Sequence, residues 1–118
     1  MRLPVGPGAL HALRYGHGGP AVLLLHGFTT NATLWQRVAP ILLAGGCQVV
    51  APDLLGFGES DRPVAGQYTV GAQARQLDRA LALLRVSRVV AVGQDLGCSV
   101  IRRLAAIRPE RILGLVLC

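Results

Sequence analysis

The stretch from Val89 to Ser99 reads VVAVGQDLGCS, and it decides the fold. The four apolar residues from Val89 to Val92 predict a strand buried on both faces, as in a parallel sheet. Residues 97–107 predict a helix, because apolar side chains recur there every three or four positions. A buried strand that turns directly into a helix is typical of α/β proteins, which bind ligands at the carboxyl edge of the sheet.

A glycine-flanked aspartate, Gly93-Gln94-Asp95-Leu96-Gly97, lies between this strand and helix. So sharp a turn strains the backbone of its central residue, and the flanking glycines relieve crowding. The Asp95 side chain should then project above the carboxyl edge of the sheet. The pattern has the form of the nucleophile elbow G-x-S-x-G, with aspartate in place of serine. Taken alone, it leaves open that Asp95 only caps the following helix.

An aspartate nucleophile implies a particular chemistry. A carboxylate is ordinarily ionised at pH 7, so Asp95 would displace a leaving group at an sp3 carbon without a base and form an alkyl ester. A water molecule, deprotonated by a histidine, would then attack the ester carbonyl. The backbone N–H of Leu96 is a candidate donor to the resulting oxyanion. Ser60 and Ser99 lack glycines at elbow spacing, so a serine nucleophile is not expected.

Strands and helices alternate along the rest of the chain. Apolar runs and turn residues predict further strands over 9–15, 21–25, 48–51 and 112–117, and further helices over 33–44 and 70–84. This order predicts a mostly parallel sheet with helices on both faces and right-handed crossovers. No helix follows the last strand to cover it, so we expect a chain that is cut short or completed by a second chain.

Composition narrows the class of protein. Hydrophobic residues make up 52% of the 118 residues, enough for the core of one domain. No apolar run approaches the roughly 18 residues of a membrane-spanning helix, and no signal peptide is evident, so a cytoplasmic location is expected. The net charge of +6 comes from arginines spread along the chain, and only 4% of residues are aromatic. These features argue against nucleic-acid binding.

Neither the cysteines nor the glycines indicate a metal or cofactor site. Cys47, Cys98 and Cys118 are far apart and lack zinc-binding spacing, so we expect buried thiols in a reducing compartment. The Gly56-Phe57-Gly58 stretch lacks the third glycine of a dinucleotide-binding loop. We therefore expect no cofactor, a small-molecule substrate, and no nucleic-acid or membrane partner. The oligomeric state stays open.

Four motifs in order resemble the α/β-hydrolase family, in the branch of epoxide hydrolases and haloalkane dehalogenases. Leu23 to Phe28 is similar to the family's His-Gly motif, and Val50 to Pro63 resembles its D-x-x-G-x-G-x-S-x-x-P loop. The elbow at Gly93 to Gly97 comes next, and then Pro109-Glu110-Arg111. The resemblance implies an α/β-hydrolase fold. Residues 1–118 would be the N-terminal part of its single domain, ending before the cap and the C-terminal half.

The resemblance also implies roles for single residues. Asp95 matches the nucleophile, and Phe28 matches the residue whose backbone N–H is the second oxyanion donor beside that of Leu96. Phe28 and Trp35 would also line the substrate pocket. His26 would be a structural residue beside the oxyanion loop, not the general base.

The family's remaining catalytic residues would lie further along the chain. The family order is nucleophile, acid, then histidine. All three histidines precede Asp95, and His11 and His17 are expected at the surface in a turn region. The catalytic histidine and acid would therefore follow Cys118, and we expect the chain by itself to lack turnover.

Two positions leave the substrate open. Haloalkane dehalogenases carry tryptophan directly after the nucleophile, where Leu96 stands, and usually a polar residue where Phe28 stands. Phe28 suits epoxide hydrolases, although these also usually have that tryptophan, and Gln94 is seen in some dehalogenases. An epoxide or a carbon–halogen bond is therefore expected. An ester or carbon–carbon bond hydrolase and a non-catalytic binding protein of this fold are the alternatives.

Overall fold

The computed structural model describes all residues 1–118 as six strands, three α-helices and two short 3-10 helices. The strands are β1 (Arg2–Pro4), β2 (Ala9–Tyr15), β3 (Ala21–Leu25), β4 (Gln48–Pro52), β5 (Val89–Gly93) and β6 (Ile112–Leu117). The helices are α1 (Ala39–Ala44), α2 (Val70–Leu83), α3 (Leu96–Ile107), η1 (Ala32–Trp35) and η2 (Pro109–Arg111). No helix is long and apolar enough to cross a membrane.

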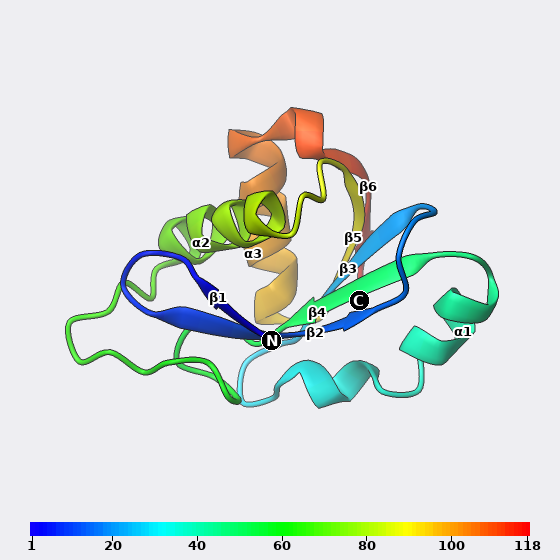
Figure 1. Cartoon of the computed structure of the whole chain (residues 1–118). Coiled ribbons are helices and arrows are strands. Elements are labelled where there is room, and N and C mark those ends of the chain that lie inside the picture. Colours follow the sequence, from blue (N-terminus) through cyan, green and yellow to red (C-terminus); the bar gives the residue numbers. More distant parts are fainter.

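All six strands form one sheet in the order β1-β2-β4-β3-β5-β6. Strands β4, β3, β5 and β6 are parallel, whereas β2 is antiparallel to both of its neighbours. Helices α2 and α3 lie together on one face of the sheet, and α1 lies on the other (Figure 1). The predicted mostly parallel sheet with helices on both faces is therefore confirmed.

The core has two parts because β3 is buried on both faces. Leu23 and Leu25 pack into the large cluster under α2 and α3, whereas Val22 and Leu24 pack into the smaller cluster on the α1 face. All five residues of β3 are buried. A strand covered on both sides excludes polar side chains, which is why this segment is a continuous apolar run and not an alternating one.

The single helix expected over residues 33–44 is wrong. The structure instead has η1, which ends at Trp35, and the separate helix α1, which begins at Ala39. Pro40 explains the break, because it has no N–H and its ring would clash with the carbonyl of Gln36 in a continuous helix. In the first turn of α1 no N–H is needed, so proline is tolerated there.

The three cysteines are free thiols. Cys47 and Cys98 are half-buried, but Cys118 is exposed, so the expectation of buried thiols is wrong for Cys118. This residue directly follows β6, the strand at the edge of the sheet. Side chains at this edge are less covered than those of the central strands.

The packing of α2 predicts unequal effects from one kind of substitution. Leu77 is 1% exposed in the large cluster, whereas Leu83 on the same helix is 50% exposed. We expect Leu77→Ala to lower the free energy of unfolding by about 2–5 kcal/mol, because it leaves a cavity. Leu83→Ala should change it by about 0.5 kcal/mol or less. Urea denaturation of both variants measures the difference, and equal losses would contradict this packing.

Candidate functional site

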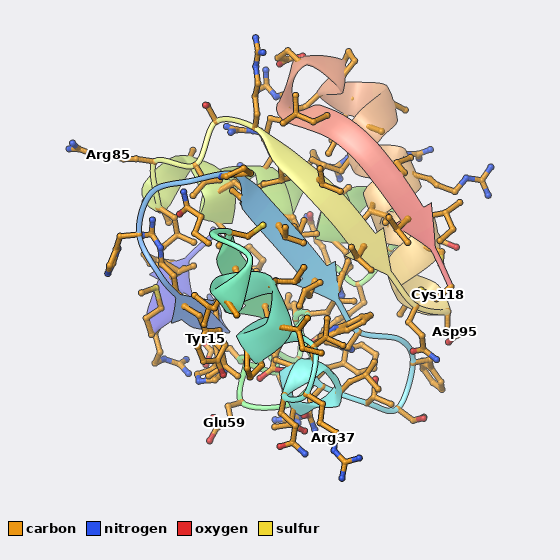
Figure 2. The ribbon with its side chains drawn as sticks, turned by 90° about the vertical axis from the view of Figure 1, so that its right-hand side faces the viewer. Tyr15, Arg37, Glu59, Arg85, Asp95 and Cys118 are labelled. Atoms are coloured by element: carbon orange, nitrogen blue, oxygen red, sulfur yellow. The ribbon has the colours of Figure 1, made fainter.

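The candidate site lies where the chain changes direction across the sheet. From β3 the chain continues to β4 on one side, and it later returns to β5 on the other side of β3. The loops after β3 and β5 therefore border a crevice at the carboxyl edge, where open α/β sheets bind ligands. Figure 2 shows Asp95 at this edge, beside Cys118 at the end of β6.

The turn after β5 is tight enough to require glycine on both sides of Asp95. Asp95 has φ 55° and ψ −117°, a left-handed conformation that side chains other than glycine rarely adopt. A Cβ on Gly93 would lie 2.8 Å from the carbonyl carbon of Gly97. A Cβ on Gly97 would lie 2.5 Å from the carbonyl oxygen of Leu25. Gly93 thus lets the turn close onto the start of α3, and Gly97 lets that helix pack directly against the end of β3.

The Asp95 carboxylate is held by the loop after β3 and not by its own helix. The backbone N–H of Phe28 donates to Oδ2 of Asp95 at 3.1 Å. Asp95 stands at the N-cap position of α3, yet its side chain makes no capping hydrogen bond. The interpretation of Asp95 as a helix cap is therefore wrong. The backbone N–H of Leu96, the first residue of α3, donates to no acceptor in the chain.

Gly27 brings this loop and the elbow into contact. A Cβ at Gly27 would lie 2.5 Å from Oε1 of Gln94, 2.7 Å from Cβ of Asp95 and 2.8 Å from the carbonyl oxygen of Gln94. Only a residue without a side chain lets the backbone approach so closely. The donation from Phe28 to Asp95 depends on that approach.

His26 is buried and engaged through both ring nitrogens. Its Nε2 accepts a hydrogen bond from the backbone N–H of Leu54 at 2.9 Å, so Nδ1 carries the proton and donates to the carbonyl of Gly27 at 2.8 Å. Burial lowers the pKa of His26 from its ordinary value because the charged ring would lose its hydration. A neutral ring with both nitrogens occupied joins two loops and is not placed to take a proton from water near Asp95.

Asp53 is the second buried polar residue that organises these loops. Its Oδ1 accepts from the backbone N–H of Ala32 at 2.6 Å, and its Oδ2 accepts from the backbone N–H of Glu59 at 3.0 Å. The Nδ1 of His11 also lies 3.0 Å from Oδ2. One carboxylate therefore fixes the start of η1, the glycine-rich loop after β4 and strand β2.

Two expectations about histidines meet different outcomes here. His17 is exposed in the turn between β2 and β3, as expected. His11 is not in a turn, because it lies in β2 and contacts both Asp53 and Glu59, with its side chain only 19% exposed. The sequence places His11 within an alternating strand, but only the fold brings Asp53 beside it.

The serines lie away from the elbow. Ser60 is buried, and its hydroxyl donates to the carbonyl of Asp53 at 2.6 Å while accepting from the backbone N–H of His11 at 2.8 Å. Ser99 is exposed on α3. Neither occupies the strained turn that Asp95 occupies.

A pocket of about 560 Å³ opens beside the elbow, lined by Phe28, Gly56, Phe57, Arg62, Tyr68, Gln73 and Leu96. Its wall is mostly apolar. The ring of Phe28 is 63% exposed and meets that of Phe57 edge to face, with centroids 5.9 Å apart. Phe28 and Leu96 thus line the same pocket, and Phe28 also donates its backbone N–H to Asp95.

Trp35 does not belong to this pocket. It is buried in the smaller cluster on the α1 face of the sheet, so the expectation that it lines the pocket is wrong. Phe57, Tyr68 and Arg62 line the pocket instead. Phe57 belongs to the glycine-rich loop that the sequence motif singled out, whereas no motif indicated that Tyr68 would line the pocket. No group of His, Cys, Asp and Glu side chains is placed to hold a metal ion.

Comparison with known proteins assigns this fold to a family. The sequence profile of the alpha/beta hydrolase fold matches residues 20–118. A haloalkane dehalogenase from Mesorhizobium japonicum is 36% identical over 97% of the chain and 36% of its own length. Lipase LipV from Mycobacterium tuberculosis is 41% identical over 92% of the chain and 40% of its own length. The crystal structure of an epoxide hydrolase from Vigna radiata has a TM-score of 0.93, with 31% identity over 99% of the chain and 38% of its own.

The chain belongs to the α/β-hydrolase fold family. It spans less than half the length of these relatives. The three relatives carry the names of different activities, although all three align with this chain over nearly its whole length. The comparisons therefore establish the family, whereas the reaction depends on the residues around Asp95.

The close approach at Gly27 predicts that alanine is not tolerated there. Gly27→Ala must push the loop away from the elbow, and we expect it to lower the free energy of unfolding by about 1–3 kcal/mol. Gly114→Ala is the matched control, because a Cβ at Gly114 meets nothing within 4 Å. Urea denaturation compares the two variants. Equal stability of both would show that the approach is not tight.

The buried His26 predicts a pH-dependent stability. Its pKa lies below 6.5 in the folded protein, so the unfolded chain takes up the proton first as the pH falls. The free energy of unfolding should therefore drop below about pH 6.5, by at most about 1.4 kcal/mol per pH unit from this group. His26→Gln should flatten that slope and His17→Gln should keep it. Nitrogen NMR of the wild-type ring tests the same point, since a His26 ring that takes up its proton at or above pH 6.5 would contradict it.

Proposed function

We propose that Asp95 is the nucleophile of a hydrolase that forms an alkyl-enzyme ester with an epoxide or a halogenated small molecule. The observation that carries the proposal is the hydrogen bond from the Phe28 N–H to Oδ2 of Asp95. It fixes one carboxylate oxygen and leaves the other, Oδ1, without a hydrogen bond in the chain. An oriented carboxylate with one free oxygen is suited to attack a carbon atom held in front of it.

In the first step, Oδ1 attacks an sp3 carbon of the substrate. A new carbon–oxygen bond forms as the bond on the opposite side of the carbon breaks. A halogen leaves as halide with the electron pair, whereas an epoxide oxygen stays on the alkyl group as an alkoxide, which takes a proton from water. Asp95 becomes an ester whose carbonyl oxygen is Oδ2. No base is needed for this step, because the nucleophile is a carboxylate and not a hydroxyl.

In the second step, water attacks the ester carbonyl and the negative charge develops on Oδ2. The N–H of Phe28 already points at this atom, and the unengaged N–H of Leu96 is the second donor that we assign to it. Donors fixed in advance stabilise developing charge without reorganising during the reaction. Collapse of the intermediate expels the alcohol and regenerates Asp95, which then contains one oxygen from water.

Removal of the ester requires a base that takes the proton of the water. The three histidines of the chain do not serve, since His26 is engaged at both nitrogens and His11 faces Asp53 and Glu59. His17 lies in an exposed turn before β3, at the opposite end of that strand from Gly27. Within residues 1–118 the ester should therefore form and persist.

The pocket supports a substrate with a compact apolar body. Phe28, Phe57 and Leu96 supply apolar surface next to Asp95. The polar groups of Tyr68 and Gln73 are already used, because the Tyr68 hydroxyl donates to the carbonyl of Pro63 and the Gln73 amide pairs with the backbone of Leu55. Arg62, which also lines the pocket, donates one Nη group to the carbonyl of Gly58. Binding would thus rest mainly on apolar burial and would leave the bond to be cleaved in front of Asp95.

Trapping of the ester tests the proposal. After incubation with an aryl epoxide or a bromoalkane and quenching in acid, the intact mass of the protein should rise by one substrate-derived group, and peptide mapping should place that group on Asp95. Asp95→Asn should abolish the adduct. Glu110→Gln removes an exposed carboxylate outside the elbow, and this variant should still form the adduct on Asp95. An adduct on a serine, or none with either reagent, would contradict the proposal.

Oxygen labelling separates the ester route from direct attack by water. In a longer form of the protein that also supplies the base, turnover in H₂¹⁸O should put the label in the Asp95 carboxylate, since the water oxygen ends on the enzyme when the ester is cleaved. If Asp95 only activated a water molecule, the label would appear in the product during the first turnover and never in the carboxylate.

A further inference from the structure

The arginines of α2 and α3 lack acidic partners. All twelve basic residues are arginines, against six carboxylates. Asp61 pairs with Arg2, Asp78 pairs with Arg108 and Arg111, and Glu110 lies near Arg108. Asp53 and Glu59 face His11, and Asp95 is at the elbow. No carboxylate is therefore left for Arg75 on α2 or for Arg102 and Arg103 on α3.

Two of these guanidinium groups converge on one point. Gly71, in the first turn of α2, is buried, and a Cβ placed on it would lie 3.4 Å from Nη1 of Arg75 and 3.4 Å from Nη2 of Arg103. Two like charges that approach the same point repel each other, and an anion between them would remove that repulsion. The two side chains come from different helices, so the packing of α2 against α3 brings them together.

A hollow of about 310 Å³ lies beside this point, lined by Val70, Ser99, Arg102, Arg103 and Ala106. Arg75 borders a second hollow together with Asp78, and it comes near the first hollow through its approach to Arg103 at Gly71. Ser99, Arg103 and Ala106 are spaced four and three residues apart, so they share one face of α3. The polar groups of this wall are the hydroxyl of Ser99 and the guanidiniums of Arg102 and Arg103. The wall offers hydrogen-bond donors and positive charge, and it contains no acidic group.

We propose that this hollow between α2 and α3 binds a phosphate-type oxyanion, held by Arg103 and the Ser99 hydroxyl, with Arg75 reaching the anion from α2 beside Gly71. Guanidinium groups bind phosphate oxygens through paired, charge-assisted hydrogen bonds, and two of them with a hydroxyl match a tetrahedral oxyanion. The site lies on the helical face of the sheet, whereas the pocket beside Asp95 is lined by other residues. The ligand is a free phosphate, a phosphorylated small molecule or the headgroup of an anionic lipid.

Equilibrium dialysis of the complete protein against inorganic phosphate tests the site, with chloride adjusted to keep the ionic strength fixed. Arg75→Gln and Arg103→Gln should each weaken phosphate binding by about tenfold or more, since each removes a charged donor. Arg88→Gln removes an exposed arginine that has no ion pair and lies outside the hollow, so it should bind phosphate as the wild type does. Surface arginines of this kind can be replaced without unfolding the protein.

Vesicle binding distinguishes the sources of the oxyanion. In sedimentation with vesicles of phosphatidylglycerol or of phosphatidylcholine alone, a lipid headgroup site predicts binding only to the anionic vesicles and its loss in Arg75→Gln and Arg103→Gln. Phosphate binding without vesicle binding would identify a soluble ligand. The proposal is overturned if the wild type binds neither, or if the two variants bind as tightly as Arg88→Gln.

Discussion

The structure depends on how closely two backbones approach at the carboxyl edge of the sheet. The loop after β3 packs against the turn after β5 with no space for a Cβ at Gly27 or Gly97, and the turn itself leaves no space for one at Gly93. This crowding holds Asp95 in a strained conformation and puts its carboxylate within reach of the Phe28 N–H. Strain of this kind persists only when the surroundings impose it, and here the buried strands β3 and β5 do so.

Two buried polar residues, His26 and Asp53, hold the loops in the positions that this close contact requires. His26 joins Gly27 to the segment after β4, and Asp53 joins the start of η1 to the glycine-rich loop. Both are fully hydrogen-bonded, so their burial costs little and restricts the loops to one arrangement. A site that forms charge in a reaction benefits from groups that are already in place.

The sequence predicted the elements that have strong local signals, such as the continuous apolar run of β3 and the period of α2. Strand β1 was not predicted, because three residues are too few to show a periodic pattern. One helix was predicted through Pro40, although proline does not fit the interior of a helix. Contacts between distant segments were the hardest to predict. Nothing in the sequence around Trp35 indicated which face of the sheet its side chain would pack against. The hydrogen bond between Phe28 and Asp95 spans 67 positions, so only the family resemblance indicated that these residues act together.

The hydrogen bond to Asp95 comes from the backbone of Phe28, whereas the Phe28 side chain lines the pocket. The two roles of this residue are therefore independent. Any amino acid except proline supplies that N–H, so mutation there can reshape the pocket wall without losing the donor. The Phe28 side chain is 63% exposed and forms part of the pocket wall, while the donor beneath it belongs to the backbone. A substitution at this position therefore acts on what the pocket can hold and leaves the donor to the Asp95 carboxylate in place.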